Sequence, residues 1–557
     1  MAADEMKARI AEDSALEEHI SRVTIGTIHS FCLDLVQSRG NLIGLGTDLV
    51  LFESDDDRRA VLRKVFLGNP ALNEFYSKQP DKEKLVQRCL QLISEQKRMF
   101  IMPENSTTSA PFPLIYSEYN QHLLEQNALD FDDILFFAYR ILTESQDVCR
   151  IYTSVYRYIC IDEAQDLNFA QYQVIRSLCG DHFNNIMMVG DPNQSIYGFN
   201  GSNSAFMTVS FVEDFSPTVY RLNENFRSAK QIVAFANQLE HYDSTTNYVY
   251  DGELVASKLP DEEHEAAYIA DRIEQLLRHG HPDVEGPITL ERIAVIARNK
   301  YVFSHLEKVL NDRGHPYHFK KNNAGIENES DLMRVFELAL RILINSKDYI
   351  HLAQIRAYVG TSKPYIEASD SIETLKHLLK GTQYESLLVA LEMLSGNTPD
   401  VPAALNTIEQ AISTANDDER YLVTLDINQW RSHWKKYCML VPRELRSLTS
   451  FRNQISLGKT RESVANNGIS LLTAHMSKGL QYDVVFIMGM CEGVFPDYRA
   501  LKSGGEQLAQ ETNNMYVAVT RAKRLCYITY PAKKRMPWGD IKVQSPSQYI
   551  RGILVQD

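Results

Sequence analysis

The sequence predicts an α/β protein with two parallel-sheet regions, each interrupted by a long helical insertion. Short apolar runs that end in polar loops recur in two separated parts of the chain, and helical stretches follow them. Two other stretches carry apolar residues at three-and-four spacing without strand signals. A chain of 557 residues exceeds the size of one hydrophobic core, so we expect about three or four domains.

The first sheet region opens the chain. Its strand-like runs are VTIGTIHSF, YRYICIDEAQD and NNIMMVGDP. The stretch after the first run contains DRRAVLRKVFL and KEKLVQRCLQLISEQKR, whose apolar residues fall on one helical face. We therefore assign residues 1–54 and 128–216 to this region, and residues 55–127 to a helical insertion within it.

The second sheet region has strand-like runs in PTVYRLNENF, RIAVIARN, GISLLTAH, DVVFIMGM and RLCYITYP. We assign residues 217–322 and 465–557 to it, and residues 323–464, which include the helical pattern DLMRVFELALRILI, to a second insertion. DEEHEAAYIADRIEQLL has the pattern of a helix packed on a sheet. Its apolar face comprises Ala266, Ile269, Ala270, Ile273 and Leu277.

Composition narrows the class of protein. Apolar residues make up 44% and charged residues 23%, which is typical of a globular chain. A net charge of −14 argues against coating nucleic acid by bulk electrostatics, but it leaves room for a narrow groove that grips single strands by aromatic stacking. The acidic start and the lack of a long apolar run predict a cytoplasmic protein without a membrane partner. The eight cysteines form no CxxC pair, so we expect reduced and mostly buried thiols.

The most informative segment is YRYICIDEAQD, in which an apolar run ends in Asp162 and Glu163. Ligands of open α/β sheets bind beyond the carboxyl ends of the strands, so both acids should face a ligand. One carboxylate can hold Mg²⁺ while the other orients and deprotonates a water molecule, which is the chemistry of nucleotide hydrolysis. Two acids at a strand end more often belong only to a solvated loop, so the surrounding motifs must decide whether Asp162 and Glu163 are functional.

A second apolar run, IMMVG, ends in the loop DPNQSIYGF, and its first residue, Asp191, lies 28 positions after Glu163. The amide of Gln194 could hydrogen-bond both a γ-phosphate and the attacking water. Tyr197 and Phe199 follow within five positions and could offer ring faces to a nucleic-acid base, although an isolated aromatic residue is usually core.

IDEAQD and GDPNQSIYGF together resemble motifs II and III of the UvrD and Rep branch of superfamily 1 DNA helicases. Further stretches resemble that family's other motifs in the same order: TIGTIHSF, ALDFDDIL, RLNENFRS, LLTAHMSKGLQYDVVFIMGM, YVAVTRAK and SPSQYI. The likeness spans nearly the whole chain and is weakest in the two insertions. It implies two RecA-like P-loop NTPase motor domains, ATP and Mg²⁺ as cofactors, and 3′-to-5′ movement on single-stranded DNA or a 3′-tailed duplex.

The resemblance also implies roles for individual residues. Arg227 and Arg521 would reach the γ-phosphate and act with Glu163 and Gln194 in catalysis, while Asp162 would hold the metal. Phe226 would stack on the adenine, and Gln481 stands where a Glu commonly meets the ribose. The residues implied in DNA contact are Thr27, His29, Tyr197, Phe199, Thr473 and His475.

The family pattern is broken at the phosphate-binding loop. The chain holds no G-x-x-x-x-G-K-[ST] in the required place, and its opening MAADEMKARI resembles the end of motif Ia, which lies downstream of that loop. Gly458-Lys459-Thr460 lacks the first glycine and a preceding strand, so we read it as a chance match. Smaller departures are Asn200 in place of an Arg, and Thr512 and Asn513 in place of paired arginines.

Three hypotheses follow from this break. The chain could be a helicase whose loop lies in upstream residues, a non-hydrolysing DNA-binding or scaffold protein, or a subunit whose protein partner supplies the loop. In each case the first lobe lacks a strand and a helix. We therefore expect exposed apolar edges beside Ile159 and Ile161, and poor order around residues 1 to 30.

Overall fold

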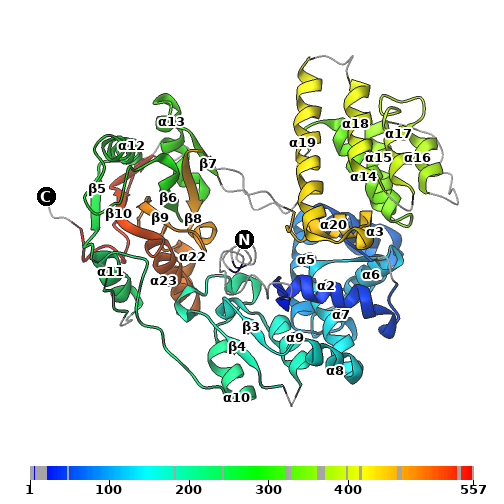
Figure 1. The fold of residues 1–557 in the computed structure, drawn as a ribbon, viewed down its shortest axis with the longest axis horizontal. Coiled ribbons are helices and arrows are strands. Elements are labelled where there is room, and N and C mark those ends of the chain that lie inside the picture. The colour runs from blue at the N-terminus through cyan, green and yellow to red at the C-terminus, as the bar shows by residue number, and fades with distance from the viewer. Residues whose placement is uncertain are drawn as a thin grey trace.

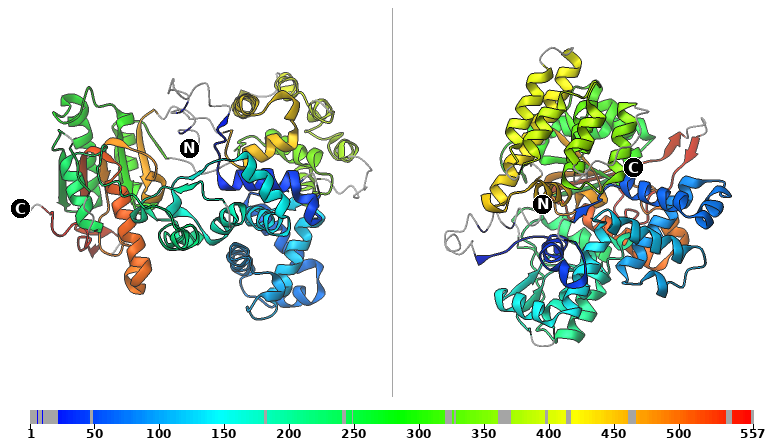
Figure 2. Two further views of the ribbon diagram at one scale, coloured as in Figure 1. Left: turned by 60° about the horizontal axis from the view of Figure 1, so that its bottom comes forward. Right: turned by 90° about the vertical axis from the view of Figure 1, so that its right-hand side faces the viewer.

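The computed structural model is an α/β structure with two lobes and two helical insertions (Figures 1 and 2). It describes Met6, Ile10 and residues 22–46, 49–180, 183–240, 244–247, 249–319, 325–326, 328–360, 371–396, 399–412, 417–460, 467–535 and 541–554. Our expectation for residues 1 to 30 falls largely outside these ranges. No helix within them is long and apolar enough to cross a membrane.

The first lobe is built around two short parallel strands, β3 (Ile159–Ile161) and β4 (Ile186–Met188). Helix α9 (Phe169–Cys179), which begins at a capping box between Asn168 and Gln171, packs on one face of this pair. The other face is open: Cys160 is exposed, as are Met187 (54%) and Val189 (40%). A parallel sheet is normally covered on both faces. Ile159 and Ile161 are themselves half-buried, so the apolar exposure expected beside them lies on this face of the pair.

The first insertion leaves the lobe and returns to it through a second parallel pair, β1 (Val50–Leu51) and β2 (Ala128–Leu129). Between these strands lie α3 (Asp55–Gly68), α4 (Pro70–Ser77), α5 (Lys82–Arg98) and α6 (Phe112–Glu125), which share an apolar core. Helices α2 (Ile28–Arg39), α7 (Phe131–Glu144) and α8 (Gln146–Val155) complete the lobe.

The second lobe contains a six-stranded parallel sheet in the order β5-β10-β9-β6-β8-β7. The strands are β5 (Glu253–Leu259), β6 (Ile293–Ala297), β7 (Tyr317–Phe319), β8 (Ile469–Thr473), β9 (Tyr482–Ile487) and β10 (Ala522–Pro531). Helices α11 (Lys230–Glu240) and α23 (Gly505–Val519) cover one face. Helices α12 (Glu262–His279) and α13 (Ser304–Asp312) cover the other, with the predicted apolar face of α12 turned to the sheet.

The second insertion is helical throughout its described residues and lies beside the first insertion (Figure 1). Its core joins seven helices. They are α14 (Asp331–Ile344), α15 (Tyr349–Val359), α16 (Ser371–Leu379), α17 (Leu387–Leu394), α18 (Val401–Ala411), α19 (Asp417–Leu440) and α20 (Leu448–Ser456). Largely buried ion pairs join the insertion to the first lobe and first insertion: Arg452 to Glu53 (2.5 Å), and Arg341 to Asp57 (3.2 Å).

Two strand expectations are wrong. VTIGT is irregular until α2 begins at Ile28, and PTVYRLN is an exposed irregular segment in which Tyr220 is 82% and Leu222 85% exposed. A strand forms only where a neighbour satisfies its backbone groups, and no described strand runs beside either segment. Conversely, β5 and β7 were not predicted. The expectation for the cysteines is confirmed, since all eight are free and five are buried.

Candidate active site

Asp162 and Glu163 follow β3 at its carboxyl end, as predicted, and both are exposed. Glu163 has a φ of 51°, which is uncommon for a residue other than glycine and is held only where the surroundings fix it. Gln165 supplies this restraint, because its Nε2 donates to Glu163 Oε2 at 2.6 Å. Gln165 thus holds the Glu163 carboxylate beyond the strand end.

The loop after β4 is tied to the loop after β3. Gln165 Oε1 accepts a hydrogen bond from the backbone N–H of Asp191 (3.0 Å), and the Asp191 carboxylate accepts one from Gln194 Nε2 (2.8 Å). Residues Pro192–Gln194 form a 3₁₀ turn capped by Asp191. The amide of Gln194 is therefore held beside the acidic loop, where the sequence placed it.

Arg521 approaches this amide from the second lobe. It stands between α23 and β10, is only 2% exposed, and donates from Nη2 to Gln194 Oε1 at 3.2 Å. Its Nε donates to the carbonyl of Val517, which fixes the guanidinium. Burial, followed by the neighbouring Arg227 cation, lowers the pKa of Arg521 to about 10. A buried cation beside a second cation is stabilised by an anion, so this position suits an anionic ligand.

Phe226 and Arg227 lie on the second-lobe side of a cleft of about 1620 Å³ between the lobes. Both side chains are exposed, Phe226 to 76%. Asn225 shapes this turn, because its Oδ1 accepts the backbone N–H groups of Arg227 and Ser228. Gln194 and Gln481 line the same cleft, as does Asp191, so four of the seven predicted nucleotide residues share one space. The other three, Asp162, Glu163 and Arg521, are not among the residues that line it.

Three predicted DNA residues form a ring cluster, defined here as Tyr197, Phe199 and His475. The ring centroids of Tyr197 and Phe199 are 6.1 Å apart, and His475 lies 6.4 Å from the first and 5.7 Å from the second. Phe199 is 67% exposed. Burial, followed by Arg298, lowers the pKa of His475 to about 4, so the imidazole is neutral at pH 7. The cluster therefore presents apolar ring faces.

The other predicted DNA residues lie outside this cluster. The Thr27 side chain caps α2 by accepting the backbone N–H of Ser30, and Thr473 caps α21 (Ala474–Ser477) in the same way. His29 packs edge-on against Phe131 at 6.0 Å. Among the described residues, the ring of His29 contacts Phe131 and no ring of the cluster. Thr473 lies two positions before His475 at the end of β8.

Comparison with known proteins agrees with this arrangement. The model of the UvrD/REP helicase N-terminal domain matches residues 1–216, and that of the UvrD-like helicase C-terminal domain matches residues 220–361 and 405–533. A DNA helicase II of Rickettsia typhi is 30% identical over 95% of this chain and 84% of its own length. The chain belongs to the UvrD/Rep helicase family.

Two further relatives are an ATP-dependent DNA helicase PcrA of Staphylococcus epidermidis and a probable DNA helicase II homolog of Mycoplasma capricolum. The first is 27% identical over 99% of this chain and 78% of its own length, and the second is 26% identical over 95% and 76%. The similarity therefore extends across both lobes of this UvrD/Rep-like chain.

The residues of this UvrD/Rep-like chain fit part of an Mg-ATP site. Asp162 and Glu163 suit a hydrated Mg²⁺, which typically takes one or two carboxylates and fills its shell with water and phosphate oxygens. The described residues hold no cluster of three or more acidic, His or Cys side chains that would form a complete metal cage. Arg227 and Arg521 suit the γ-phosphate. The amides and lysine of a phosphate-binding loop have no counterpart in this sequence.

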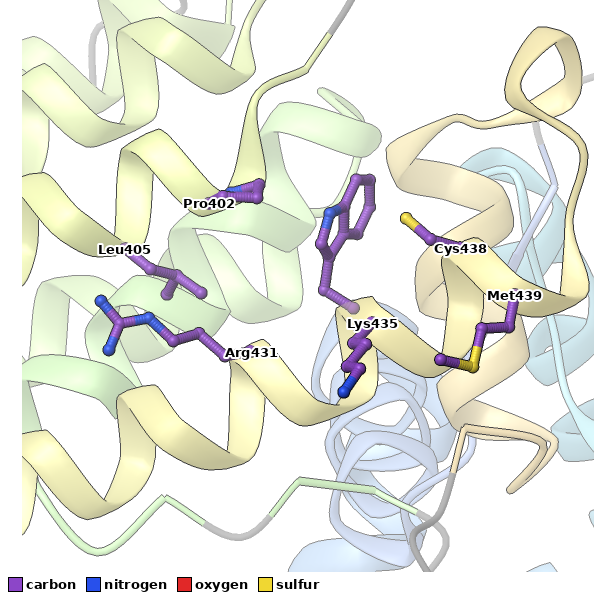
Figure 3. A pocket seen from close by; sticks show the side chains of 7 residues that line it. Pro402, Leu405, Arg431, Lys435, Cys438 and Met439 are labelled. Carbon is purple, nitrogen blue, oxygen red and sulfur yellow. The ribbon is translucent and has the colours of Figure 1, made fainter.

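Gly458-Lys459-Thr460 has the surroundings of a helix end. It follows α20, and the Thr460 hydroxyl is 2.7 Å from His433 Nδ1 of α19 within the second insertion. Another hollow of about 470 Å³ lies between α18 and α19 (Figure 3). Apolar side chains with Arg431 and Lys435 line it, and no carboxylate does, so it offers nothing for magnesium.

Sequence reasoning missed three residues of the site. Gln165 holds Glu163, and Lys478 of the second lobe donates to both carboxylate oxygens of Asp166, at 2.8 and 2.6 Å. Asn513, noted above only as a departure from the family pattern, also crosses between the lobes and donates to the carbonyl of Ser195 at 2.8 Å. All three are polar residues within or next to the quoted motifs, and this position was the only sequence feature that could have indicated them.

Proposed function

We propose that this protein is an ATP-dependent DNA helicase that moves 3′ to 5′ along single-stranded DNA and opens 3′-tailed duplexes. The observation that carries the proposal is the contact between Arg521 and Gln194. It brings a buried cation of one lobe to an amide beside Glu163 of the other. A site shared between two lobes makes their closure depend on the nucleotide, which is what a motor needs.

In the proposed reaction Glu163 accepts a proton from the attacking water, and Gln194 orients that water. The new bond forms between the water oxygen and the γ-phosphorus while the bond to the leaving ADP oxygen breaks. Arg227 and Arg521 stabilise the negative charge that develops. Asp162 would hold Mg²⁺, which neutralises phosphate charge when bound.

Two residues of the second lobe would hold the nucleoside part of ATP. The exposed ring of Phe226 offers a face for the adenine, and the side-chain amide of Gln481 can hydrogen-bond the ribose. Both line the cleft that also contains Asp191 and Gln194. The cleft therefore has groups suited to the adenine and the ribose, and Arg227 in the same lining suits the γ-phosphate.

The ring cluster would stack on the bases of a single DNA strand. Stacking on aromatic side chains tolerates any sequence, and each stacked base contributes about 1–3 kcal/mol. Thr473 precedes the cluster, and Thr27 and His29 would contact the same strand elsewhere in the first lobe. An acidic protein can bind DNA in this way because stacking requires only a locally basic channel and leaves the rest of the surface acidic.

The phosphate-binding loop would come from residues beyond these 557 or from a protein partner, and without it we expect very weak hydrolysis. The open face of β3 and β4 supports this, because Met187 and Val189 are exposed where a covered sheet would bury them. We also propose that residues 1–54 and 128–216 form one motor domain, and that residues 217–322 and 465–557 form the other. Residues 55–127 and 323–464 are the insertions, and we place the protein in the cytoplasm, where ATP and DNA meet.

Strand displacement tests this function. A segment with a strand, the loop G-x-x-x-x-G-K-[ST] and a helix, taken from a helicase of this family, is joined ahead of the chain. The joined protein should displace a strand from a 3′-tailed duplex with ATP and leave a 5′-tailed duplex paired. Glu163→Gln is the matched control and should bind DNA without displacing a strand. Failure on both duplexes by a folded, DNA-binding protein would argue against the proposal.

The missing loop favours a second candidate, a non-hydrolysing DNA-binding or scaffold protein. This candidate predicts that the 557-residue chain binds single-stranded DNA and shows no ATP turnover, with or without the added segment. Measurable turnover by the chain alone would rule it out. A partner that supplies the loop would instead copurify with the chain and restore turnover.

A further inference from the structure

The one-turn helix α21 of the second lobe contacts the first lobe at two places. His475, within the helix, lies against Tyr197 and Phe199 of the ring cluster. Lys478, directly after the helix, reaches the acidic loop that follows β3. The same short element therefore contacts both the proposed DNA site and the proposed hydrolytic site.

The ammonium group of Lys478 has its hydrogen-bonding capacity filled by first-lobe acceptors. Its Nζ donates to the two carboxylate oxygens of Asp166 at 2.8 and 2.6 Å, and to the carbonyl of Gln194 at 2.5 Å. It also lies 3.7 Å from Glu163 Oε2. The side chain is only 6% exposed, so this contact between the lobes is largely sheltered from water.

Such a contact is costly to break. Burial raises the pKa of Asp166 and Lys478 counters that effect, so the carboxylate depends on this ammonium for compensation. Removing one member of a buried charge pair leaves the other uncompensated. The backbone of Asp166 is also restrained, because its carbonyl accepts a hydrogen bond from the hydroxyl of Ser202. A displacement of Lys478 is therefore transmitted to the acidic loop.

Lys478 also contacts the ring cluster. Its Nζ lies 5.3 Å from the ring centroid of Tyr197, within the range of a cation–π interaction. The contacts are thus continuous from Phe199, through Tyr197 and His475, to Lys478, and from there to Asp166 and Glu163. The exposed ring of Phe199 lies at one end of this series and the exposed carboxylate of Glu163 at the other, with the sheltered Lys478 between them.

We propose that Lys478 is a positioning residue that couples occupancy of the ring cluster by a DNA base to the orientation of Glu163. This inference rests on the proposed function, which supplies the DNA and the role of Glu163. A base that stacks on the rings moves His475, and Lys478 moves with it because one helical turn separates them. Asp166 follows its ammonium partner, and the Glu163 carboxylate, which Gln165 holds in the same loop, shifts toward its working position.

Two simpler roles make different predictions. If Lys478 bound a DNA phosphate directly, its loss would lower the slope of log affinity against log salt by about one. If it were only a structural ion pair, its loss would loosen the acidic loop equally with and without DNA. A positioning residue leaves the salt slope unchanged and alters only how the acidic loop responds to DNA.

Hydrogen exchange of the 557-residue chain with and without oligo-dT tests the coupling without requiring ATP turnover. In the wild type, oligo-dT should slow exchange several-fold at residues 195–200 and also at residues 159–168. In Lys478→Met the first effect should remain and the second should disappear, whereas Lys478→Arg should restore part of it. Lys435→Met is the matched control and should behave as wild type. It removes an exposed lysine that lines the hollow between α18 and α19 (Figure 3).

Equal protection of residues 159–168 in wild type and Lys478→Met would overturn the coupling while leaving the proposed function intact. Loss of about one from the salt slope in Lys478→Met would also overturn it, in favour of a phosphate contact. If oligo-dT protects neither segment of the wild type, DNA binding itself fails, and the coupling fails with it. Should Lys478→Met not fold, Asp166→Asn/Lys478→Met removes both charges and must show the same loss.

Discussion

The Nε2 atom of His351 lies 3.0 Å from Oδ1 of Asp57, although 294 positions separate the two residues in the chain. His351 belongs to α15 of the second insertion and Asp57 to α3 of the first. The other ring nitrogen of His351 lies 2.5 Å from Asp348 Oδ2, and Arg341 pairs with Asp57. The His351 imidazole, which lies between two carboxylates, therefore links the two insertions.

This link predicts a pH-dependent contact. Burial and Arg341 both lower the pKa of His351, but Asp348 and Asp57 outweigh them and raise it above its usual 6.5. A raised His pKa contributes stability that is complete below 6.5 and is lost as the pH rises through the folded value. We expect hydrogen exchange in α3 and α15 to accelerate on the alkaline side of pH 6.5. The exchange data are corrected for the intrinsic rate at each pH.

His351→Gln provides the control, since it keeps hydrogen bonding but cannot titrate. Its α3 and α15 should exchange faster than wild type at pH 6 and show little further change up to pH 9. The pKa of Asp57 is lowered in the folded chain, first by His351 and then by Arg341, so the wild type should also lose stability in acid. Identical pH profiles for wild type and His351→Gln would contradict this account of the link.

A second buried cation joins the first insertion to the first lobe. Lys97 of α5 is 2% exposed and contacts Asp130 at 2.9 Å and Asp133 at 2.6 Å. Lys97→Met leaves the buried Asp130 and Asp133 without the ammonium that contacts both, so the free energy of unfolding should fall by about 3–5 kcal/mol in urea titrations. The exposed Lys435→Met should change it by less than about 0.5 kcal/mol. A small effect of Lys97→Met would show that water compensates these acids.

The ring cluster makes a prediction about affinity. Phe199→Ala should weaken binding of single-stranded DNA by about 1–3 kcal/mol, measured by fluorescence anisotropy. The loss should be similar for oligo-dT and oligo-dC, because stacking is tolerant of sequence, and Phe199→Trp should keep the affinity. A loss confined to one sequence would indicate base-specific hydrogen bonding instead.

Arg521 makes a prediction about turnover. Its guanidinium donates from Nη1 to the carbonyl of Leu480, and from Nη2 to Gln194. In the protein carrying the added loop segment, Arg521→Lys should lower kcat by about 10³-fold or more, since a lysine cannot reproduce the planar fork. Binding of single-stranded DNA should change little. A near-normal kcat in this mutant would show that Arg521 takes no part in the reaction.

The sequence predicted the parts of this fold whose signals are local. Strands β3 and β4 were found because each apolar run ends in polar residues, and the helix Asp331–Ile344 because its apolar spacing is regular. Strand β5 carries Ser257 and Lys258 within a mixed pattern, so its signal was weak. The segment PTVYRLN alternates apolar and polar residues like a strand, but no strand among the described residues lies beside it, and pairing depends on the whole lobe.

Contacts between distant segments could not be predicted from the sequence. Glu163 and Gln194 were found through motifs, whereas nothing local to Lys478 indicates that Asp166, 312 positions earlier, is its partner. The same holds for Asp57 and His351. Such pairs depend on how lobes and insertions pack, and a single sequence carries no record of that packing.

The most direct test of the central claim is ATP turnover by the protein carrying the added loop segment, with and without single-stranded DNA. We predict that DNA stimulates turnover many-fold and that Glu163→Gln abolishes it while leaving DNA affinity unchanged. Turnover that does not change when DNA is added, or that persists in Glu163→Gln, would contradict the claim that the two lobes form one DNA-dependent hydrolytic site.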